Sequence, residues 1–308
     1  MKLEASLSPS DVLTQVAGAL PPDARGNVII IGSLAAGYHF FAGDGARAIR
    51  TKDVDCLFSP HSKAIAAAAA VTDQLIRADW KLREGLDWSQ PGKKEDDEKD
   101  LPMVRLRPPG ETTAPWFLEL LSAPPAFEPS GPGKKLRRVE TSIGHFAICS
   151  FDFLALAEWE PLDTAHGVRI ARPEMMALAN LLHHPTIADT LIADTDRKRS
   201  NKDLGRVLAL AYLTNQRDRR DGTDELEAWA GRMWIALQAK FGDHAPQLAA
   251  RAGAGMRALL ASRADLDQAL RIANLGLLAS MDVSLEAFLA TGARFMAEVI
   301  DELEQMAH

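Results

Sequence analysis

The chain has 308 residues, enough for two domains, because domains commonly contain about 100 to 200 residues. Hydrophobic residues make up 47% and charged residues 25%, as in most globular proteins, and the net charge of -7 excludes a global basic footprint for nucleic acid. Two cysteines, Cys56 and Cys149, are too few for a disulfide framework or a zinc site and suit a reducing compartment. Neither a signal peptide nor a run of about 18 apolar residues occurs, so we expect a cytoplasmic protein without a membrane span.

The first part of the chain alternates between helix and strand patterns. Ser8 followed by Pro9 predicts the start of a helix that reaches about residue 20. The apolar run 28–31, between two glycines, is typical of a buried central strand, and residues 34–41 predict a short helix. The alanine-rich run 64–79 predicts another helix.

The middle of the chain predicts short strands separated by polar loops. Residues 103–107 and 116–122 are expected to pair, residues 80–83 to form a further strand, and residues 139–150 a strand or hairpin. The charge-rich segment 88–102 is typical of a solvated loop. A second loop is expected before residue 139, and it contains a dense basic cluster.

From about residue 151 onward the pattern becomes helical. Asp152 is expected to cap the first helix and Pro173 to open the next. Further helical patterns cover residues 199–216, 223–241, 245–262, 264–279 and 284–306. The sequence therefore predicts an α+β protein, with a mixed-sheet domain in residues 1–150 and an α-helical domain in residues 151–308.

A Gly-Ser turn, Gly32-Ser33, separates the first central strand from the helix that follows it. Glycine allows close approach of a ligand to the backbone, and Ser33 is placed to cap the helix. Free amides at a helix start favour an anion such as phosphate. An ordinary strand-to-helix turn with a serine cap explains the same residues without any function.

Three acidic residues stand out in the strand patterns. Asp53 and Asp55 lie one residue apart in TKDVDCLF, so both project from one face of a strand while Val54 points into the core. Neighbouring carboxylates repel unless a cation lies between them, and Mg²⁺ or Mn²⁺ prefers such oxygen ligands. Glu119 lies within the apolar run WFLELLS, where it is either paired or metal-bound, or turned to solvent on an edge strand.

Together these motifs resemble the nucleotidyltransferase superfamily that shares the DNA polymerase beta fold, and within it the AbiEii-like, toxin-type nucleotidyltransferases. Members share a Gly-Ser or Gly-Gly turn, a downstream Asp-x-Asp, a third acid, and a Lys-Asp pair that opens a later helix. Here these are Gly32-Ser33, Asp53-Val54-Asp55, Glu119, and the pair Lys202-Asp203 in DRKRSNKDLGRVLALAYL. The likeness spans about residues 27–215.

The resemblance implies a role for each of these residues. Asp53, Asp55 and Glu119 would be the catalytic residues and would hold Mg²⁺ or Mn²⁺. Gly32 and Ser33 would bind the nucleotide phosphates. Lys202 would contact phosphate, and Asp203 would position it or the acceptor. Without the family, Lys202 and Asp203 are also explained as two charges in the first turn of a surface helix.

The expected activity is transfer of a nucleotidyl group from an NTP to an acceptor hydroxyl or phosphate. The acceptor would be RNA or tRNA, as in toxin–antitoxin systems, or else a small molecule or a protein. A cognate antitoxin would be a further partner. A basic face for RNA would comprise Lys134, Lys135, Arg137, Arg138, Arg197, Lys198 and Arg199. Two alternatives stay open: a catalytically silent member of the fold that binds nucleotide or protein, and an unrelated helical interaction protein.

Overall fold

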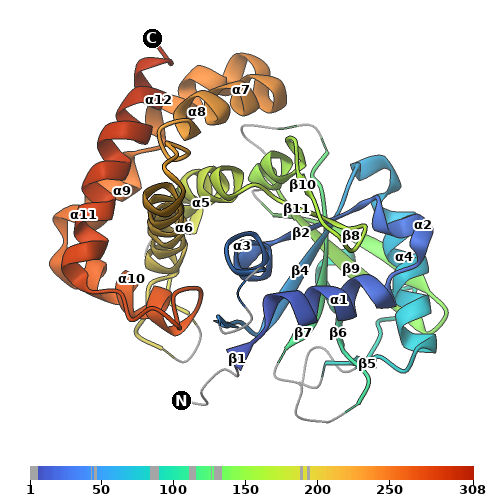
Figure 1. The fold of residues 1–308 in the computed structure, drawn as a ribbon. Coiled ribbons are helices and arrows are strands. Elements are labelled where there is room, and N and C mark those ends of the chain that lie inside the picture. The colour runs from blue at the N-terminus through green and yellow to red at the C-terminus, as the bar shows by residue number, and fades with distance from the viewer. Residues whose placement is uncertain are drawn as a thin grey trace. The chain divides into compact units, whose positions relative to one another are not determined.

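A computed structural model of the chain describes residues 6–42, 44, 47–83, 90–110, 116–125, 127, 134–187, 190–192 and 195–308. The chain divides into two compact units, Met1–Ala171 and Arg172–His308 (Figure 1). The expected division near residue 150 therefore falls inside the first unit. The reason is that β10 (Leu162–Asp163) and β11 (Arg169–Ile170) return to the sheet, where β11 pairs with β2 (Val28–Ile31).

A mixed β-sheet organises the first unit. Its other strands are β4 (Asp53–Phe58), β5 (Lys81–Leu82), β6 (Arg105–Arg107), β7 (Phe117–Ser122), β8 (Lys134–Thr141) and β9 (Gly144–Phe151). The order is β10-β11-β2-β4-β7-β6-β5, and β9 pairs with both β7 and β8. Parallel pairs (β11–β2 and β4–β7) and antiparallel pairs (β2–β4 and β6–β7) both occur, so the expected α+β class with a mixed sheet is confirmed.

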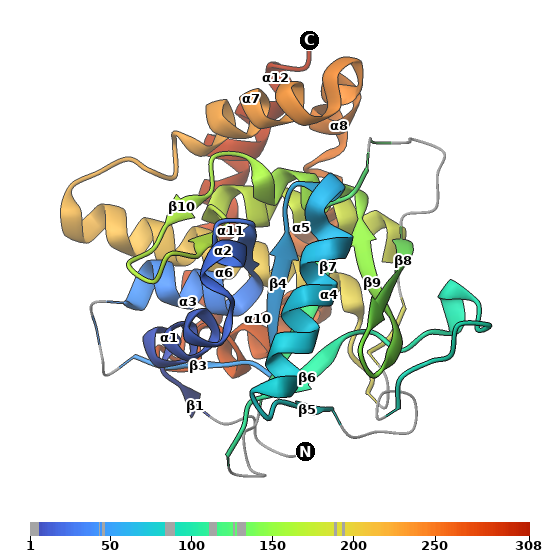
Figure 2. The same ribbon diagram turned by 90° about the vertical axis from the view of Figure 1, so that its right-hand side faces the viewer.

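The helices of the first unit are α1 (Pro9–Ala19), α2 (Pro22–Arg25), α3 (Gly32–Phe41) and α4 (His61–Arg77), with 3₁₀ turns η1 (Glu98–Asp100) and η2 (Asp152–Glu158). Helix α1 packs on α3. The α1 start is as predicted, because the Ser8 side chain accepts a hydrogen bond from the Asp11 amide at 3.3 Å. Helix α3 packs on β2 and β4, whereas α4 lies along β4, β7 and β8 (Figure 2).

Several expected strands are found, with shifted ends. Segments 103–107 and 116–122 form the antiparallel pair β6–β7, and the expected hairpin is β8–β9. The hairpin begins at residue 134, so the predicted loop before residue 139 is wrong in its last residues. Asp152 does not cap a helix: η2 follows Phe151, and Asp152 Oδ1 lies 3.7 Å from Lys135 Nζ instead. A separate small pair joins β1 (Ser6–Leu7) to β3 (Ile49–Arg50).

The core of the first unit contains the residues that the strand periodicity placed there. Val28, Ile29 and Ile30 of β2 are fully buried, and so are Val54 and Cys56 of β4. Burial, together with the neighbouring Asp55 charge, raises the pKa of the Cys56 thiol well above its usual range. Cys56 is therefore a packed, unreactive side chain.

The second unit consists of helices. They are α5 (Pro173–Ile187), α6 (Arg199–Asp221), α7 (Trp229–Phe241), α8 (Ala245–Arg251), α9 (Ala254–Ala261), α10 (Arg263–Leu275), α11 (Leu285–Phe295) and α12 (Asp301–Gln305). Gly242–His244 forms a 3₁₀ turn and Met296–Ile300 a π-helical turn between α11 and α12. Pro173 opens α5 as expected, but the predicted helix 245–262 is divided into α8 and α9. No helix within the described residues combines the length and apolar composition that a bilayer span needs.

Helix α6 is the centre of the second unit, where α5, α9, α10 and α11 pack against it. Gly205 allows α10 to approach closely, because a Cβ atom at this position would lie 2.9 Å from the carbonyl oxygen of Ala269. The helix ends at Gly222, which has φ +67° and supplies the left-handed cap.

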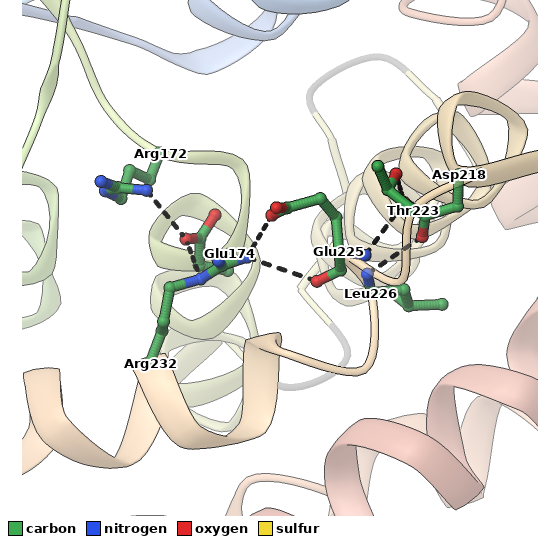
Figure 3. Close-up of polar contacts among 7 residues, drawn as sticks. All are labelled: Arg172, Glu174, Asp218, Thr223, Glu225, Leu226 and Arg232. Atoms are coloured by element: carbon green, nitrogen blue, oxygen red, sulfur yellow. Dashed lines mark hydrogen bonds and ion pairs between the residues drawn. The ribbon is translucent and has the colours of Figure 1, made fainter. Parts of the chain in front are cut away.

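A buried polar network fixes the chain between α6 and α7 (Figure 3). Asp218 accepts hydrogen bonds from Thr223 Oγ1 at 2.7 Å and from the amides of Glu225 and Leu226 at 2.9 and 3.1 Å. Arg232 Nε lies 2.8 Å from Glu174 Oε1, and Arg232 also pairs with Glu225. Burial raises the pKa of Glu174, and the Arg232 charge opposes that rise.

We predict that Asp218→Ala destabilises the protein by about 3 kcal/mol, because it removes a buried carboxylate that accepts three hydrogen bonds. Urea denaturation followed by circular dichroism would measure the change. The matched control is Asp221→Ala at the exposed end of the same helix, where Asp221 pairs with Arg220; it should leave the free energy of unfolding nearly unchanged. Equal effects of the two substitutions would contradict the prediction.

Candidate functional site

The three candidate carboxylates lie on one face of the central sheet. Asp53 and Asp55 alternate with buried Val54 along β4, as the period of two predicts. In the parallel β4–β7 pair, Asp55 stands opposite Glu119 and Asp53 opposite Phe117. Because β7 lies between β4 and β6, Glu119 is on an interior strand, and the edge-strand alternative for this residue is wrong.

Gly32 brings the start of α3 against Asp55. In the β2–β4 register, Ile31 stands opposite Asp55, and Gly32 follows at once with φ +73°. A Cβ atom on Gly32 would lie 2.9 Å from Asp55 Oδ2. The position therefore needs glycine twice: for its left-handed backbone and for the space that Asp55 occupies.

Ser33 does not cap α3. The helix begins at Gly32, its N-cap is Ile31, and no side chain makes a capping hydrogen bond there. The predicted cap is wrong because the left-handed Gly32 starts the helix one residue before Ser33. Ser33 is half-buried in the first turn, beside the strand that carries Asp55.

Glu119 is held by an arginine that the sequence did not single out. Arg105 of β6 stands opposite Glu119 and donates to both carboxylate oxygens, from Nε at 2.9 Å and from Nη2 at 3.0 Å. Their side chains are 20% and 13% exposed, so water weakens this pair less than a surface ion pair. The charge of Glu119, predicted to need a partner, is compensated by Arg105.

Two further arginines lie on this side of the sheet. Arg107 shares the Arg105 face of β6, and the Arg83 amide donates to the Arg105 carbonyl at 2.9 Å, which continues the β5–β6 register. The Arg83 guanidinium lies over the Phe117 ring at 4.2 Å from its centroid. Burial lowers the pKa of Arg83 and the charges of Arg105 and Arg107 add to the effect, whereas the charges of Glu119 and Asp53 oppose it.

The alternation Arg-Leu-Arg at residues 105–107 was the available signal for these cations. Leu106 between them is fully buried, so the period of two sends both arginines to the opposite face. The expected pairing of residues 103–107 with 116–122 already placed these arginines beside Glu119. The sequence did not show that β7 also neighbours β4, or that β5 neighbours β6.

Asp53 and Asp55 fit a divalent cation such as Mg²⁺ or Mn²⁺ in the chemistry of their donor atoms. Both offer carboxylate oxygens from one face, the ligand type that these ions prefer. Asp53 Oδ1 also accepts a hydrogen bond from Thr51 Oγ1 at 2.9 Å, which orients it. In the part of the chain that the structure describes, no three His, Cys, Asp or Glu side chains are grouped as a metal site. A third ligand from Glu119 would require its pair with Arg105 to open.

The expected basic face on β8 is largely engaged within the protein. Arg137 pairs with Glu98 at 4.0 Å, and Arg138 donates to the carbonyl oxygens of Lys93 and Asp96. Lys135 lies beside Asp152. The charge-rich loop thus supplies the acceptors for the arginines of the basic strand. The side chain of Lys134 lies outside the described residues.

Lys202 and Asp203 belong to the second unit, on α6. Lys202 is the fourth residue of the helix and Asp203 the fifth. Asp203 is 9% exposed, so the interpretation of this pair as surface charges is wrong for the aspartate. Burial raises the pKa of Asp203, while the nearby charges of Arg206 and His183 act against the rise. His183 comes from α5, which packs along α6.

The start of α6 is anchored by α10. The Lys198 amide donates to Gln268 Oε1 at 2.8 Å, and Lys198 Nζ lies 3.1 Å from Asp265 Oδ1. Asn201, which is buried, donates to Asp265 at 2.8 Å. Two of the cations expected to face RNA, Arg197 and Arg199, flank this anchored Lys198.

No protein-family model, curated protein or solved structure matches this chain.

Gly32→Ala should destabilise the protein by about 1 to 3 kcal/mol, because alanine is strained at φ +73° and its methyl group meets Asp55. Gly18→Ala is the control: Gly18 lies in α1 with open space around it, so alanine should stabilise by up to about 1 kcal/mol. Thermal unfolding of both variants measures the difference. A Gly32→Ala protein as stable as Gly18→Ala would rule out the close approach.

Arg105→Met should destabilise by about 2 to 3 kcal/mol, because it leaves the half-buried Glu119 carboxylate without its bidentate partner. Glu119→Leu should cost a similar amount for the converse reason. The double substitution should recover most of the loss, since two apolar side chains replace a compensated pair. Denaturant unfolding of all three variants tests this cycle, and additive losses would show that the two residues do not interact.

Proposed function

We propose that this protein is a metal-dependent nucleotidyltransferase, which transfers a nucleotidyl group from an NTP to an acceptor hydroxyl or phosphate. The observation that carries the proposal is the placement of Asp53, Asp55 and Glu119 on one face of adjacent strands, with Gly32 at a helix start against Asp55. Acidic side chains and helix-terminal amides are the groups that bind a metal–triphosphate complex. The sequence likeness to the AbiEii-like family points to the same chemistry.

Each candidate site residue in the first unit has a role in this proposal. Asp53 and Asp55 would hold Mg²⁺ or Mn²⁺, and Thr51 keeps Asp53 oriented. Such an ion neutralises charge on the triphosphate and stabilises the leaving pyrophosphate. Gly32 permits close approach of a phosphate to the backbone at the start of α3, where Ser33 contributes an amide and a hydroxyl. Glu119, once free of Arg105, would complete the acidic set or accept the acceptor's proton.

Within the second unit, the family resemblance assigns Lys202 to phosphate binding and the buried Asp203 to the positioning of Lys202 or the acceptor. The acceptor would be an RNA, in particular a tRNA, a small molecule or a protein, and a cognate antitoxin would restrain the activity of a toxin-type enzyme. The reaction depends on positioning and electrostatics rather than on a covalent intermediate with the protein.

One observation favours a second function. Arg105 occupies both oxygens of Glu119, which is the state expected of a catalytically silent member that binds nucleotide or a partner protein without transfer. The two functions differ in turnover but agree in metal and nucleotide binding at Asp53 and Asp55.

Incubation of the protein with each labelled NTP, Mg²⁺ or Mn²⁺ and total RNA should yield labelled product. Asp53→Asn and Asp55→Asn should each lower the rate on the order of 100-fold or more, because charge stabilisation at the reacting phosphate is lost. Asp23→Asn, an exposed carboxylate on α2, is the matched control and should leave the rate unchanged.

Titration of the same variants with Mn²⁺ separates the two functions. Mn²⁺ binding that depends on Asp53 and Asp55 without any labelling of RNA, protein or small molecules supports the silent binder. Labelling that is equal in the wild type and both variants would overturn the enzyme, and absence of Mn²⁺ binding would overturn both.

A further inference from the structure

The candidate face changes from acidic to basic across the sheet. Asp53 and Asp55 lie on β4, Glu119 on β7, Arg105 and Arg107 on β6, and Arg83 continues β5. Neighbouring strands are about 4.8 Å apart, so β6 lies roughly 10 Å from β4. A ligand held by the acids through a metal would therefore meet the arginines with a different part of its structure.

The three arginines are not equivalent, because one of them is already compensated. Arg105 is engaged in the bidentate pair with Glu119. Within the described residues, neither Arg83 nor Arg107 forms an ion pair with a carboxylate. Arg83 and Arg107 thus carry charges that no ion pair within the described residues compensates, while Glu119 and Asp53 act on Arg83 from a longer distance.

Arg83 is held ready for a ligand by its stacking on Phe117. Its Cζ lies 4.2 Å from the ring centroid, and Arg105 approaches the same ring to 5.7 Å. A guanidinium that lies over an aromatic face keeps its N–H groups at the edge of its plane, where they can donate to a ligand. Arg107 lies two residues along β6 from Arg105, which stands opposite Arg83, so the two arginines project from neighbouring strands on one face. The charge of Arg107 also contributes to the lowered pKa of Arg83.

We infer that Arg83 and Arg107 form an anion subsite that binds a phosphate group of the ligand. A carboxylate carries one charge and is satisfied by one guanidinium, as Glu119 is by Arg105. A phosphate carries up to two charges and three acceptor oxygens, which matches two guanidinium groups. We further infer that the acceptor of the transfer carries this phosphate, and this second step rests on the proposed nucleotidyl transfer. The existence of the subsite does not depend on that activity.

Binding of sodium pyrophosphate to the full-length protein in EDTA, measured by calorimetry, tests the subsite without any metal. Arg83→Gln and Arg107→Gln should each weaken binding about tenfold, and the double variant about a hundredfold, because each guanidinium supplies a charge-assisted hydrogen bond. Arg77→Gln, an exposed arginine of α4, is the matched control and should bind as the wild type does. Arg83→Lys keeps the charge without the planar fork and should fall between.

Thermal unfolding of every variant checks that all the proteins compared are folded. If the Arg83 substitutions unfold the protein, the binding affinity of Arg107→Gln decides the outcome. Wild-type protein that does not bind pyrophosphate, or variants that bind as tightly as the wild type, would overturn the subsite. Two further probes identify the source of the phosphate. Weaker binding of a short 5′-hydroxyl RNA by the double variant assigns a phosphodiester, and weaker binding of glycerol 3-phosphate assigns a small phosphomonoester.

Substitution of Asp53 and Asp55 separates a test of the anion subsite from a test of the proposed enzyme activity. A variant with both Asp53→Asn and Asp55→Asn should lose nucleotidyl transfer but bind metal-free pyrophosphate at least as tightly as the wild type, since negative charge near the arginines is removed. Pyrophosphate binding that depends on Arg83 and Arg107 in a protein without transferase activity would retain the subsite and reject the enzyme. The reverse result would reject the subsite alone.

Discussion

Asp55 stands between Ile31 of β2 and Glu119 of β7 because three strands keep one register through the centre of the sheet. A slip of one residue would exchange every side chain between the two faces and bury the acids in place of Val54 and Cys56. The apolar residues therefore decide where the charged ones stand. The cost of burying an aspartate among them keeps β4 in place, and with it the whole candidate site.

Charge compensation then arranges what the register brings together. Carboxylates on β4 and β7 would repel one another on a bare sheet, and arginines on β5 and β6 would do the same. Contact between the two groups at Arg105 and Glu119 lowers both costs. Charges on β8 are compensated in the same way. The charge-rich segment 88–102, which the sequence predicted to be a solvated loop, supplies Glu98 to Arg137 and backbone carbonyl oxygens to Arg138.

Local patterns predicted the local parts of this molecule. The buried run of β2, the outward Asp53 and Asp55, and the β6–β7 pair follow from alternation and turn residues, which act over a few positions. Strand order does not, because it depends on contacts between distant segments. Arg83 was missed for that reason, because nothing in the sequence places residues 80–83 beside β6. Likewise, local patterns do not show that β11 returns from beyond residue 150 to pair with β2. Ser33 was assigned a capping role from its residue type, whereas the backbone angle of Gly32 decides where the helix starts.

Gly205 affects how mutational data on this chain would be interpreted. It lies against the backbone of α10 and so lets that helix approach α6. Helix α10 supplies Asp265 and Gln268, which hold Lys198 and Asn201 at the start of α6, just before Lys202 and Asp203. A larger side chain at Gly205 would push that anchor away. In a screen that scores only loss of function, this glycine would be grouped with ligand-contacting residues, and a parallel screen of protein abundance would be needed to separate them.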